Sequence, residues 1–313
     1  MYQGKFSTGG ERGGRRRRMG RLLAALALVL AVFTVALSGL ALYQRAANRG
    51  LTGRIEKLEQ EKEELAQQLE EAVGNQPPAQ TGTAGLEYQE LYADLYADPP
   101  EEYVTPPAKT VFLTFDDGPS DNTVKILDLL DQYGAKATFF VTGTNITGRE
   151  ALLKDIVQRG HTLAVHTYSH DYKAIYASVE AFLDDFSKVY NQIVAATGQA
   201  PTLFRFPGGS VNGYNKIHYQ RIIAEMTRRG FQYYDWNVDS GDAAGKKVDA
   251  AKITYNVVSE ARDDYSVVLL HDAAAKTTTV EALPAILKQL TDGGYTFAAL
   301  TGTVNPPHFN YMS

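Results

Sequence analysis

Residues 111–120 read Val-Phe-Leu-Thr-Phe-Asp-Asp-Gly-Pro-Ser. The first five are apolar on both alternating faces, which is typical of a strand in a parallel sheet that is covered on both sides. Gly118 and Pro119 then end the strand. The adjacent carboxylates of Asp116 and Asp117 are therefore expected at the carboxyl end of a strand.

A helix is expected directly after this turn. Ser120 or Asp121 is expected to cap it, and the apolar positions between Thr123 and Tyr133 recur at helical spacing. The stretch therefore predicts a strand, a turn and a helix in immediate succession.

Asp116 and Asp117 should diverge because side chains alternate along a strand, so the two carboxylates can have different roles. The competing interpretation is a turn acid followed by a helix cap, since Asp-Asp-Gly is also ordinary turn chemistry. The rest of the chain has to decide between these two interpretations.

Strand-like and helix-like patterns alternate from about residue 109 to residue 299. Strands are expected at 111–115, 137–141, 162–166, 203–206, 232–235, 266–270 and 296–299. Helical spacing is clearest at 179–196, 222–229, 250–261 and 280–290. Alternation of this kind predicts an α/β fold with a parallel sheet, either open or closed into a barrel.

His166 and His170 are four residues apart at the end of the third expected strand. Two imidazoles at this spacing can reach one metal ion from a helical turn or a loop. Without a metal, they would be one buried structural histidine and one surface histidine. His161, His218 and His308 have no such neighbours and are interpreted as structural.

Asp117, His166 and His170 together would form a two-histidine, one-carboxylate metal site with open coordination positions. That ligand set suits catalytic zinc but also ferrous iron, so the residue types alone do not name the metal. A bound divalent ion acidifies a water molecule and polarises a carbonyl oxygen. Asp116, as the unligated neighbour, is then the candidate to accept a proton from that water.

Three further strand ends carry polar residues. Arg205 precedes the Pro-Gly-Gly turn at 207–209, whose backbone N–H groups could face an oxyanion. The segment 235–242 reads Asp-Trp-Asn-Val-Asp-Ser-Gly-Asp, and His271 follows the apolar run 266–270. Each alone fits a salt bridge, a turn or a capped helix. Their coincidence indicates a catalytic centre, because active sites of strand-helix barrels form at the carboxyl ends of the strands.

Composition places the 313 residues among globular proteins, with 44% hydrophobic and 21% charged residues. The charge is uneven: residues 1–21 carry a net +6, and since the whole chain carries −5, the remainder carries −11. An acidic main body argues against nucleic acid as a partner. The sequence has no cysteine, which excludes disulfides and cysteine metal ligands.

Residues 22–42 contain no charged side chain and are long enough to cross a bilayer as a helix. The arginines before them favour a basic cytoplasmic tail at 1–21, a transmembrane anchor at 22–43 and an exported remainder. A cleaved signal peptide is the competing interpretation. The apolar run exceeds the usual signal core of about 7 to 15 residues, which favours the anchor.

Residues 50–73 carry apolar side chains at alternating spacings of three and four, broken at Lys62. This pattern predicts a short coiled-coil stalk that could pair two chains, although a solvated single helix fits three heptads nearly as well. Residues 74–107 are expected to form a linker with a short helix between Leu86 and Ala97. The main domain is expected at 108–301 and a tail at 302–313.

Five motifs follow one another: Thr-Phe-Asp-Asp-Gly at 114–118, His-Thr-x-x-His at 166–170, Arg-x-Pro-Gly-Gly at 205–209, Val-Asp-Ser-Gly-Asp at 238–242 and Leu-Leu-His-Asp at 269–272. In these motifs the chain resembles the polysaccharide deacetylases with a NodB homology domain, carbohydrate esterase family four. The resemblance covers about residues 108 to 301. It implies a distorted (β/α)7 barrel, hydrolysis of N-acetyl groups on glycans, and one divalent metal ion, with Zn²⁺ first and Co²⁺, Ni²⁺, Mn²⁺ or Fe²⁺ as alternatives.

The resemblance also implies a role for each motif residue. The implied catalytic set is Asp116 as general base, Arg205 as its partner, His271 as acid toward the leaving amine and Asp239 as the group that orients and charges His271. The implied metal ligands are Asp117, His166 and His170. The implied oxyanion and substrate-pocket residues are Gly208, Pro207, Leu269 and Trp236.

One position departs from the family. Many members have a tryptophan after the second acid of the fourth motif, but here Ala243 follows Asp242, which leaves open whether Trp236 compensates. The expected function is metal-dependent N-deacetylation of an N-acetylglucosamine polymer, with peptidoglycan as the leading substrate because a tether and stalk would hold the domain in the cell wall. Two alternatives are a non-catalytic glycan-binding or wall-scaffold module and a deacetylase of O-acetylated or small amide substrates.

Overall fold

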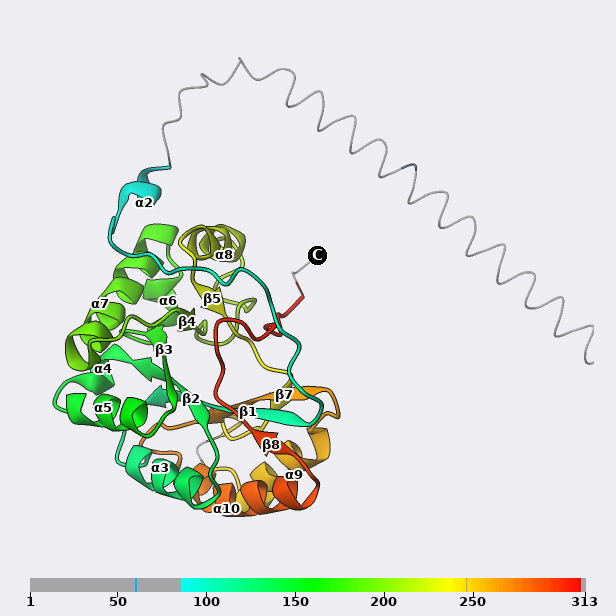
Figure 1. Cartoon of the computed structure of the whole chain (residues 1–313). Helices are drawn as coiled ribbons and strands as arrows, with labels where there is room; N and C mark the ends of the chain where they lie inside the picture. The colour runs from blue at the N-terminus through cyan, green and yellow to red at the C-terminus, as the bar shows by residue number, and fades with distance from the viewer. Residues whose placement is uncertain (1–59, 61–85, 246, 311–313) are drawn as a thin grey trace, which may run out of the picture. The chain divides into compact units, whose positions relative to one another are not determined.

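The structure, a computed structural model, describes Gln60 and residues 86–245 and 247–310 (Figure 1). Residues 86–310 belong to the unit Ala84–Ser313. The expected cytoplasmic tail, anchor and, apart from Gln60, the stalk lie outside the described residues. Within the described part of the chain, no helix has both the length and the apolar character needed to span a membrane.

Eight strands form one parallel sheet in the part of the chain that the structure describes. They are β1 (Thr110–Gly118), β2 (Ala137–Thr142), β3 (Thr162–Thr167), β4 (Leu203–Phe204), β5 (Gln232–Tyr233), β6 (Val238–Asp239), β7 (Tyr265–His271) and β8 (Thr296–Phe297). Their order in the sheet is β5-β4-β3-β2-β1-β7-β6, and β8 pairs with the first residues of β1. The long strands β1 and β7 are adjacent, with Asp116 opposite His271.

The sheet must curl, because β5 and β6 stand at its two ends yet are joined only by residues 234–237. Five Cα steps span at most about 18 Å. Six strand spacings of about 4.8 Å would separate the edges of a flat ladder by roughly 29 Å. In the described chain β5 and β6 do not pair, so the expected barrel is an incompletely closed one. The sheet contains one strand that the sequence did not predict, β6. This strand is two residues long and therefore too short to show an alternating pattern of its own.

Helices surround the outer face of the sheet (Figure 1). Their bounds are α2 (Glu87–Glu90), α3 (Thr123–Gln132), α4 (Gly143–Ile146), α5 (Glu150–Gln158), α6 (Tyr172–Ile175), α7 (Val179–Thr197), α8 (Tyr219–Arg228), α9 (Ala250–Glu260) and α10 (Thr277–Asp292).

The predicted cap of α3 is wrong in detail. The helix begins at Thr123 as expected, but its N-cap is Asn122, which makes no side-chain capping bond. The Ser120 hydroxyl instead accepts a hydrogen bond from the Asn122 N–H. The hydrogen bond accepted by Ser120 therefore closes the turn after β1 at Asn122, the residue immediately before α3.

Alternation along the strands divides the core into two layers. The outer layer, between sheet and helices, includes Val111, Leu113 and Phe115 of β1. The inner layer fills the curl of the sheet and consists of Phe112, Phe140, Ala164, Leu203, Tyr234, Val267, Leu300 and Val304. The inner positions nearest the carboxyl ends of the same strands are occupied by Asp116, His166, Arg205 and His271. Strand periodicity thus brings four distant polar residues to one end of the curl.

The segment before β1 is fastened to α8. The helix expected over residues 86–97 ends at Glu90, because Leu91 is extended and Tyr92 has a φ of 54°. The fully buried guanidinium of Arg229, which also pairs with Glu225, donates hydrogen bonds to carbonyl oxygens of this segment. The acceptors are the carbonyls of Tyr88, Leu91, Tyr92 and Leu95.

Candidate active site

A β-bulge at the end of β1 separates the two adjacent carboxylates. Asp116 pairs with Phe140 of β2 and Gly118 with Val141, so Asp117 is the extra residue. Asp117 has a φ of 68°, and the Asn145 side chain donates a hydrogen bond to its carbonyl oxygen at 2.8 Å. A bulge changes the direction in which a strand side chain points. The predicted divergence of Asp116 and Asp117 is present, and the bulge accompanies it.

Asp117, His166 and His170 form the one group of potential metal ligands found among the described residues, with ligand atoms all within 4.8 Å of one another. Asp117 Oδ1 lies 3.5 Å from His166 Nε2 and 3.2 Å from His170 Nε2. This oxygen is buried and has no hydrogen-bond partner. A buried carboxylate oxygen facing two ring nitrogens fits a divalent cation, because carboxylate and imidazole are ordinary ligands of such ions.

His166 is prepared to act as a ligand by its surroundings. Its Nδ1 lies 2.8 Å from the carbonyl oxygen of Arg205, so the ring donates there and turns Nε2 toward Asp117. Burial lowers the pKa of His166 to about 3, which favours the neutral ring.

The loop between the two histidines is held by Asp185 of α7. One carboxylate oxygen accepts from the Thr167 hydroxyl and the Tyr168 N–H, and the other accepts from the Ser169 N–H and hydroxyl. The Thr167 oxygen in turn accepts from the N–H of His170, which has a φ of 57°. Asp185 therefore fixes the loop that presents His170, although no local pattern in the sequence links it to that loop.

Asp116 is buried and lies beside Arg205. Its Oδ1 accepts a hydrogen bond from Arg205 Nη1 at 2.9 Å. The fully buried guanidinium also donates to the Thr114 hydroxyl and to the carbonyls of Tyr234 and Asp235. Burial raises the pKa of Asp116, and the charge of Arg205 opposes that rise. A carboxylate with a raised pKa is a better proton acceptor, as a general base requires.

His271 is bound to Asp242 and not to Asp239, so that part of the sequence prediction is wrong. His271 Nδ1 lies 2.7 Å from Asp242 Oδ1, and the His271 N–H donates to Asp242 Oδ2 at 2.9 Å. Burial by itself would lower the pKa of His271, but the hydrogen bond and charge of Asp242 raise it to about 9. The ring is therefore protonated at neutral pH and can act as an acid.

The turn after β6 explains why Asp242, and not the expected Asp239, contacts His271. Asp239 is exposed, and its Oδ1 accepts from the Gly241 N–H at 2.8 Å. Gly241 has a φ of 70°, in the left-handed region that glycine tolerates. This Asx turn reverses the chain so that Asp242, three residues later, faces β7. Asp-x-Gly was the signal in the sequence that Asp239 serves the turn.

The Pro-Gly-Gly turn lies beside the metal-ligand loop. Gly208 is exposed, has a φ of 75° and would place a Cβ only 2.8 Å from the Tyr172 ring. Pro207 is buried, and its carbonyl accepts from the Tyr176 hydroxyl at 2.8 Å. The Tyr172 ring also meets the His170 ring edge-on, with centroids 5.2 Å apart. Tyr172 thus lies close both to the expected oxyanion turn and to His170.

The remaining expected pocket residues lie near the same end of the curl. Leu269 is buried two residues before His271, and Trp236 is half-buried with its ring centre 5.8 Å from the Arg205 guanidinium carbon. Ala243 is exposed and offers no aromatic surface.

Residues 103–231 match the family model for polysaccharide deacetylase. The chain is 35% identical to a peptidoglycan-N-acetylglucosamine deacetylase of Bacillus cereus over 195 residues, which are 61% of this chain and 69% of that protein.

Solved structures agree. The catalytic domain of a peptidoglycan N-acetylglucosamine deacetylase from Eubacterium rectale is 38% identical with a TM-score of 0.64, covering 68% of this chain and 98% of that one. A polysaccharide deacetylase from Bacillus cereus is 33% identical with a TM-score of 0.58, covering 64% of this chain and 96% of that one.

The segment that the family model matches contains Asp116, Asp117, His166 and His170. The chain therefore belongs to the polysaccharide deacetylases, the NodB-homology hydrolases of carbohydrate esterase family four.

Proposed function

We propose that this enzyme removes the acetyl group from N-acetylglucosamine residues of a glycan polymer, with peptidoglycan as the leading substrate. The observation that carries the proposal is that two neighbouring parallel strands bring their carboxyl ends together. Asp116 on β1 is in register with His271 on β7, beside the cluster of Asp117, His166 and His170. The relatives named for peptidoglycan N-acetylglucosamine support the substrate class.

Asp117, His166 and His170 would hold a divalent cation, of which Zn²⁺ is our first choice. Such a cation supplies Lewis acidity, which polarises an acyl oxygen and makes a water molecule more acidic. Asp116, fixed by Arg205, removes a proton from the attacking water. The water oxygen bonds to the acetamide carbon, and the backbone N–H of Gly208 would donate to the developing oxyanion.

His271 then gives its proton to the leaving nitrogen as the carbon–nitrogen bond breaks. The products are acetate and a glucosamine whose amine carries the added hydrogen. Asp242 keeps the ring charged before this step and orients it by its contact with Nδ1.

We further propose that residues 22–43 anchor the chain in the cell membrane, with the catalytic domain on the outer side. The apolar run and the arginines before it support this location. Residues 50–73 would form the stalk, through which two chains could pair.

Acetate release from N-acetylglucosamine oligomers by the Zn²⁺-treated chain tests the reaction. Mass spectrometry of isolated wall fragments before and after treatment tests the substrate, with loss of acetyl mass from glucosamine expected. Asp116→Asn keeps an acceptor for Arg205 but removes the base, so its acetate release should fall by about 10²-fold or more. Unchanged release from this variant contradicts the mechanism.

The same assay separates the alternatives. Binding of the oligomers without acetate release would favour a glycan-binding module. Release from O-acetylated sugars but not from N-acetylated ones would favour an esterase. The charged His271 favours N-deacetylation, because an amine leaving group needs a proton more than an alcohol does.

A further inference from the structure

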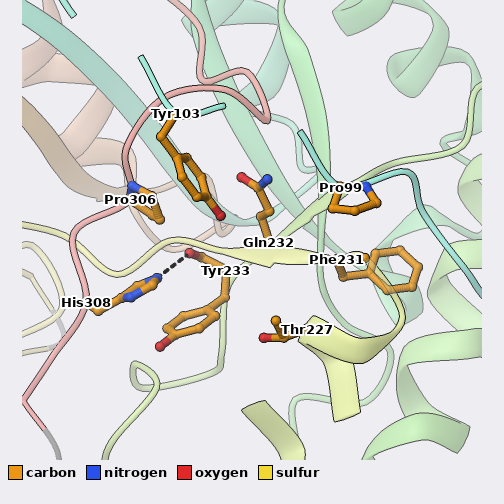
Figure 2. A pocket seen from close by; sticks show the side chains of 9 residues that line it. Pro99, Tyr103, Thr227, Phe231, Gln232, Tyr233, Pro306 and His308 are labelled. Atoms are coloured by element: carbon orange, nitrogen blue, oxygen red, sulfur yellow. Dashed lines mark hydrogen bonds between the residues drawn. The ribbon is translucent and has the colours of Figure 1, made fainter. Parts of the chain in front are cut away.

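The chain after β8 returns across the sheet and reaches the active-site end. Val104 and Val304 form a parallel bridge, and the Tyr234 hydroxyl donates to the Val304 carbonyl. Pro306 and His308 then line a cavity of about 140 Å³ together with Tyr103 and the first residues of β5 (Figure 2). Val304, Pro306 and His308 are thus packed against the domain.

His308 fixes the direction of this C-terminal segment. Its ring stacks on Tyr233 with centroids 3.9 Å apart and planes inclined by 12°. Its Nε2 lies 3.3 Å from the Tyr233 carbonyl oxygen, the contact drawn as a dashed line in Figure 2. These two contacts set the position of the next residue, Phe309.

Phe309 is tied to the Pro-Gly-Gly turn through Asp235. The Phe309 N–H donates to Asp235 Oδ2 at 2.7 Å. The same carboxylate accepts from the N–H and hydroxyl of Ser210, at 2.8 Å and 2.5 Å. One buried carboxylate therefore joins the end of the described chain to the loop that contains Gly208.

The Phe309 ring lies against the active-site loop. It meets the Trp236 ring edge-on, with centroids 4.7 Å apart. A Cβ on Gly209 would overlap the Phe309 ring and lie 3.4 Å from Trp236, so glycine is required there. Trp236 in turn lies over Arg205, which holds Asp116. Both rings retain some exposed surface.

We propose that Phe309 and Trp236 form a wall on which the sugar bearing the acetamido group packs, so that the C-terminal segment contributes a substrate-binding residue. This inference rests on the proposed function. The C–H face of a hexosamine ring is apolar and suits aromatic side chains, which commonly line ligand pockets beside a few polar groups. Ala243, the residue after Asp242, is exposed and provides no such surface.

Trp236 makes the test direct, because it is the only tryptophan in the sequence. The full chain with Asp116→Asn and added Zn²⁺ is titrated with the trimer of N-acetylglucosamine while Trp236 fluorescence is recorded. We expect a saturable change in emission. Adding Phe309→Ala should raise the Kd by about tenfold, Phe309→Tyr should stay within about twofold, and Asn310→Ala, an exposed neighbour, serves as the matched control.

Kinetics of the active chain separate binding from support of the loop. Phe309→Ala should raise KM by a similar factor with kcat nearly unchanged. A fall in kcat at unchanged KM would overturn the inference, since it would assign Phe309 to holding the Gly208 loop. Unchanged Kd and KM would overturn it too. A fluorescence response that depends on Phe309, in a chain that releases no acetate, would support the wall while the proposed function fails.

Discussion

His271 and Asp242 contact each other twice, once through the ring and once through the backbone. Nδ1 lies 2.7 Å from Oδ1, and the N–H donates to Oδ2, which also accepts from the Thr279 hydroxyl at 2.8 Å. Asp242 is 2% exposed, so this charge has no competition from bulk water. The position and the charge of the proposed acid therefore depend on one carboxylate.

Asp242→Asn should lower kcat/KM for acetate release by about 100-fold or more, because the ring loses the charge that keeps it protonated. The wild-type chain should lose activity as pH rises through the His271 pKa of about 9, and the variant should lose it at lower pH. Asp239→Asn, three residues away and exposed, should stay within about twofold. A larger loss at Asp239 than at Asp242 would reverse this assignment.

The same pair predicts a pH dependence of stability in the metal-free chain. The pKa of His271 is raised in the folded state, so its contribution is complete below the ordinary value of 6.5 and is lost as pH rises through about 9. We expect the free energy of unfolding to fall by about 3 kcal/mol over this interval. Denaturant unfolding at several pH values measures it. Asp242→Asn should flatten the curve, and an equal fall in that variant would exclude His271 as the cause.

Asp185→Asn should weaken Zn²⁺ binding by about 10- to 100-fold, because an amide cannot accept all of the hydrogen bonds that hold the loop before His170. Competition titration against a Zn²⁺ chelator gives the affinity without an activity assay. Asp184→Asn is the matched control, since Asp184 is its neighbour and binds Lys188 and Tyr92 at the surface. Equal affinities in the two variants would show that the loop does not need Asp185.

Arg229→Met should lower the free energy of unfolding by about 3 kcal/mol, because it leaves Glu225 and several carbonyl oxygens without their buried partner. Arg228→Met removes the other partner of Glu225, which is more exposed, and should cost no more than about 1 kcal/mol. Urea unfolding of the two variants compares them directly. If the two variants lose similar amounts of free energy of unfolding, the hydrogen bonds from Arg229 to residues 88–95 add little stability.

The alternation of strands and helices could be predicted because each long strand carries its own pattern. Asp116, His166, Arg205 and His271 follow apolar runs, so their meeting at one end of the sheet was predictable. The prediction of the partner of His271 failed because a turn changes the direction of the chain between the two candidate residues. Asp239 and Asp242 are alike in residue type, and only the backbone of Gly241 decides which one faces His271.

Contacts between distant segments left no local signal. Asp185 is one polar residue within a helix pattern, Asp235 reads as the end of a strand, and Phe309 follows the expected domain. Their roles arise from pairings over 16 to 74 positions of sequence. The hydrophobic periodicity of the sequence does not indicate such pairings, because each partner fits the pattern of its own helix, strand or loop whether or not the other partner is present.

The fastening of residues 88–95 by Arg229 has a mechanical consequence if the chain is tethered as proposed. Tension arriving from the membrane side would first meet the hydrogen bonds of this guanidinium, before the chain reaches β1. The force would then enter the domain at the end of α8, on the edge-strand side of the sheet. Asp116 and Asp117, at the far end of β1, would be shielded from the pull while the wall around the cell is stretched.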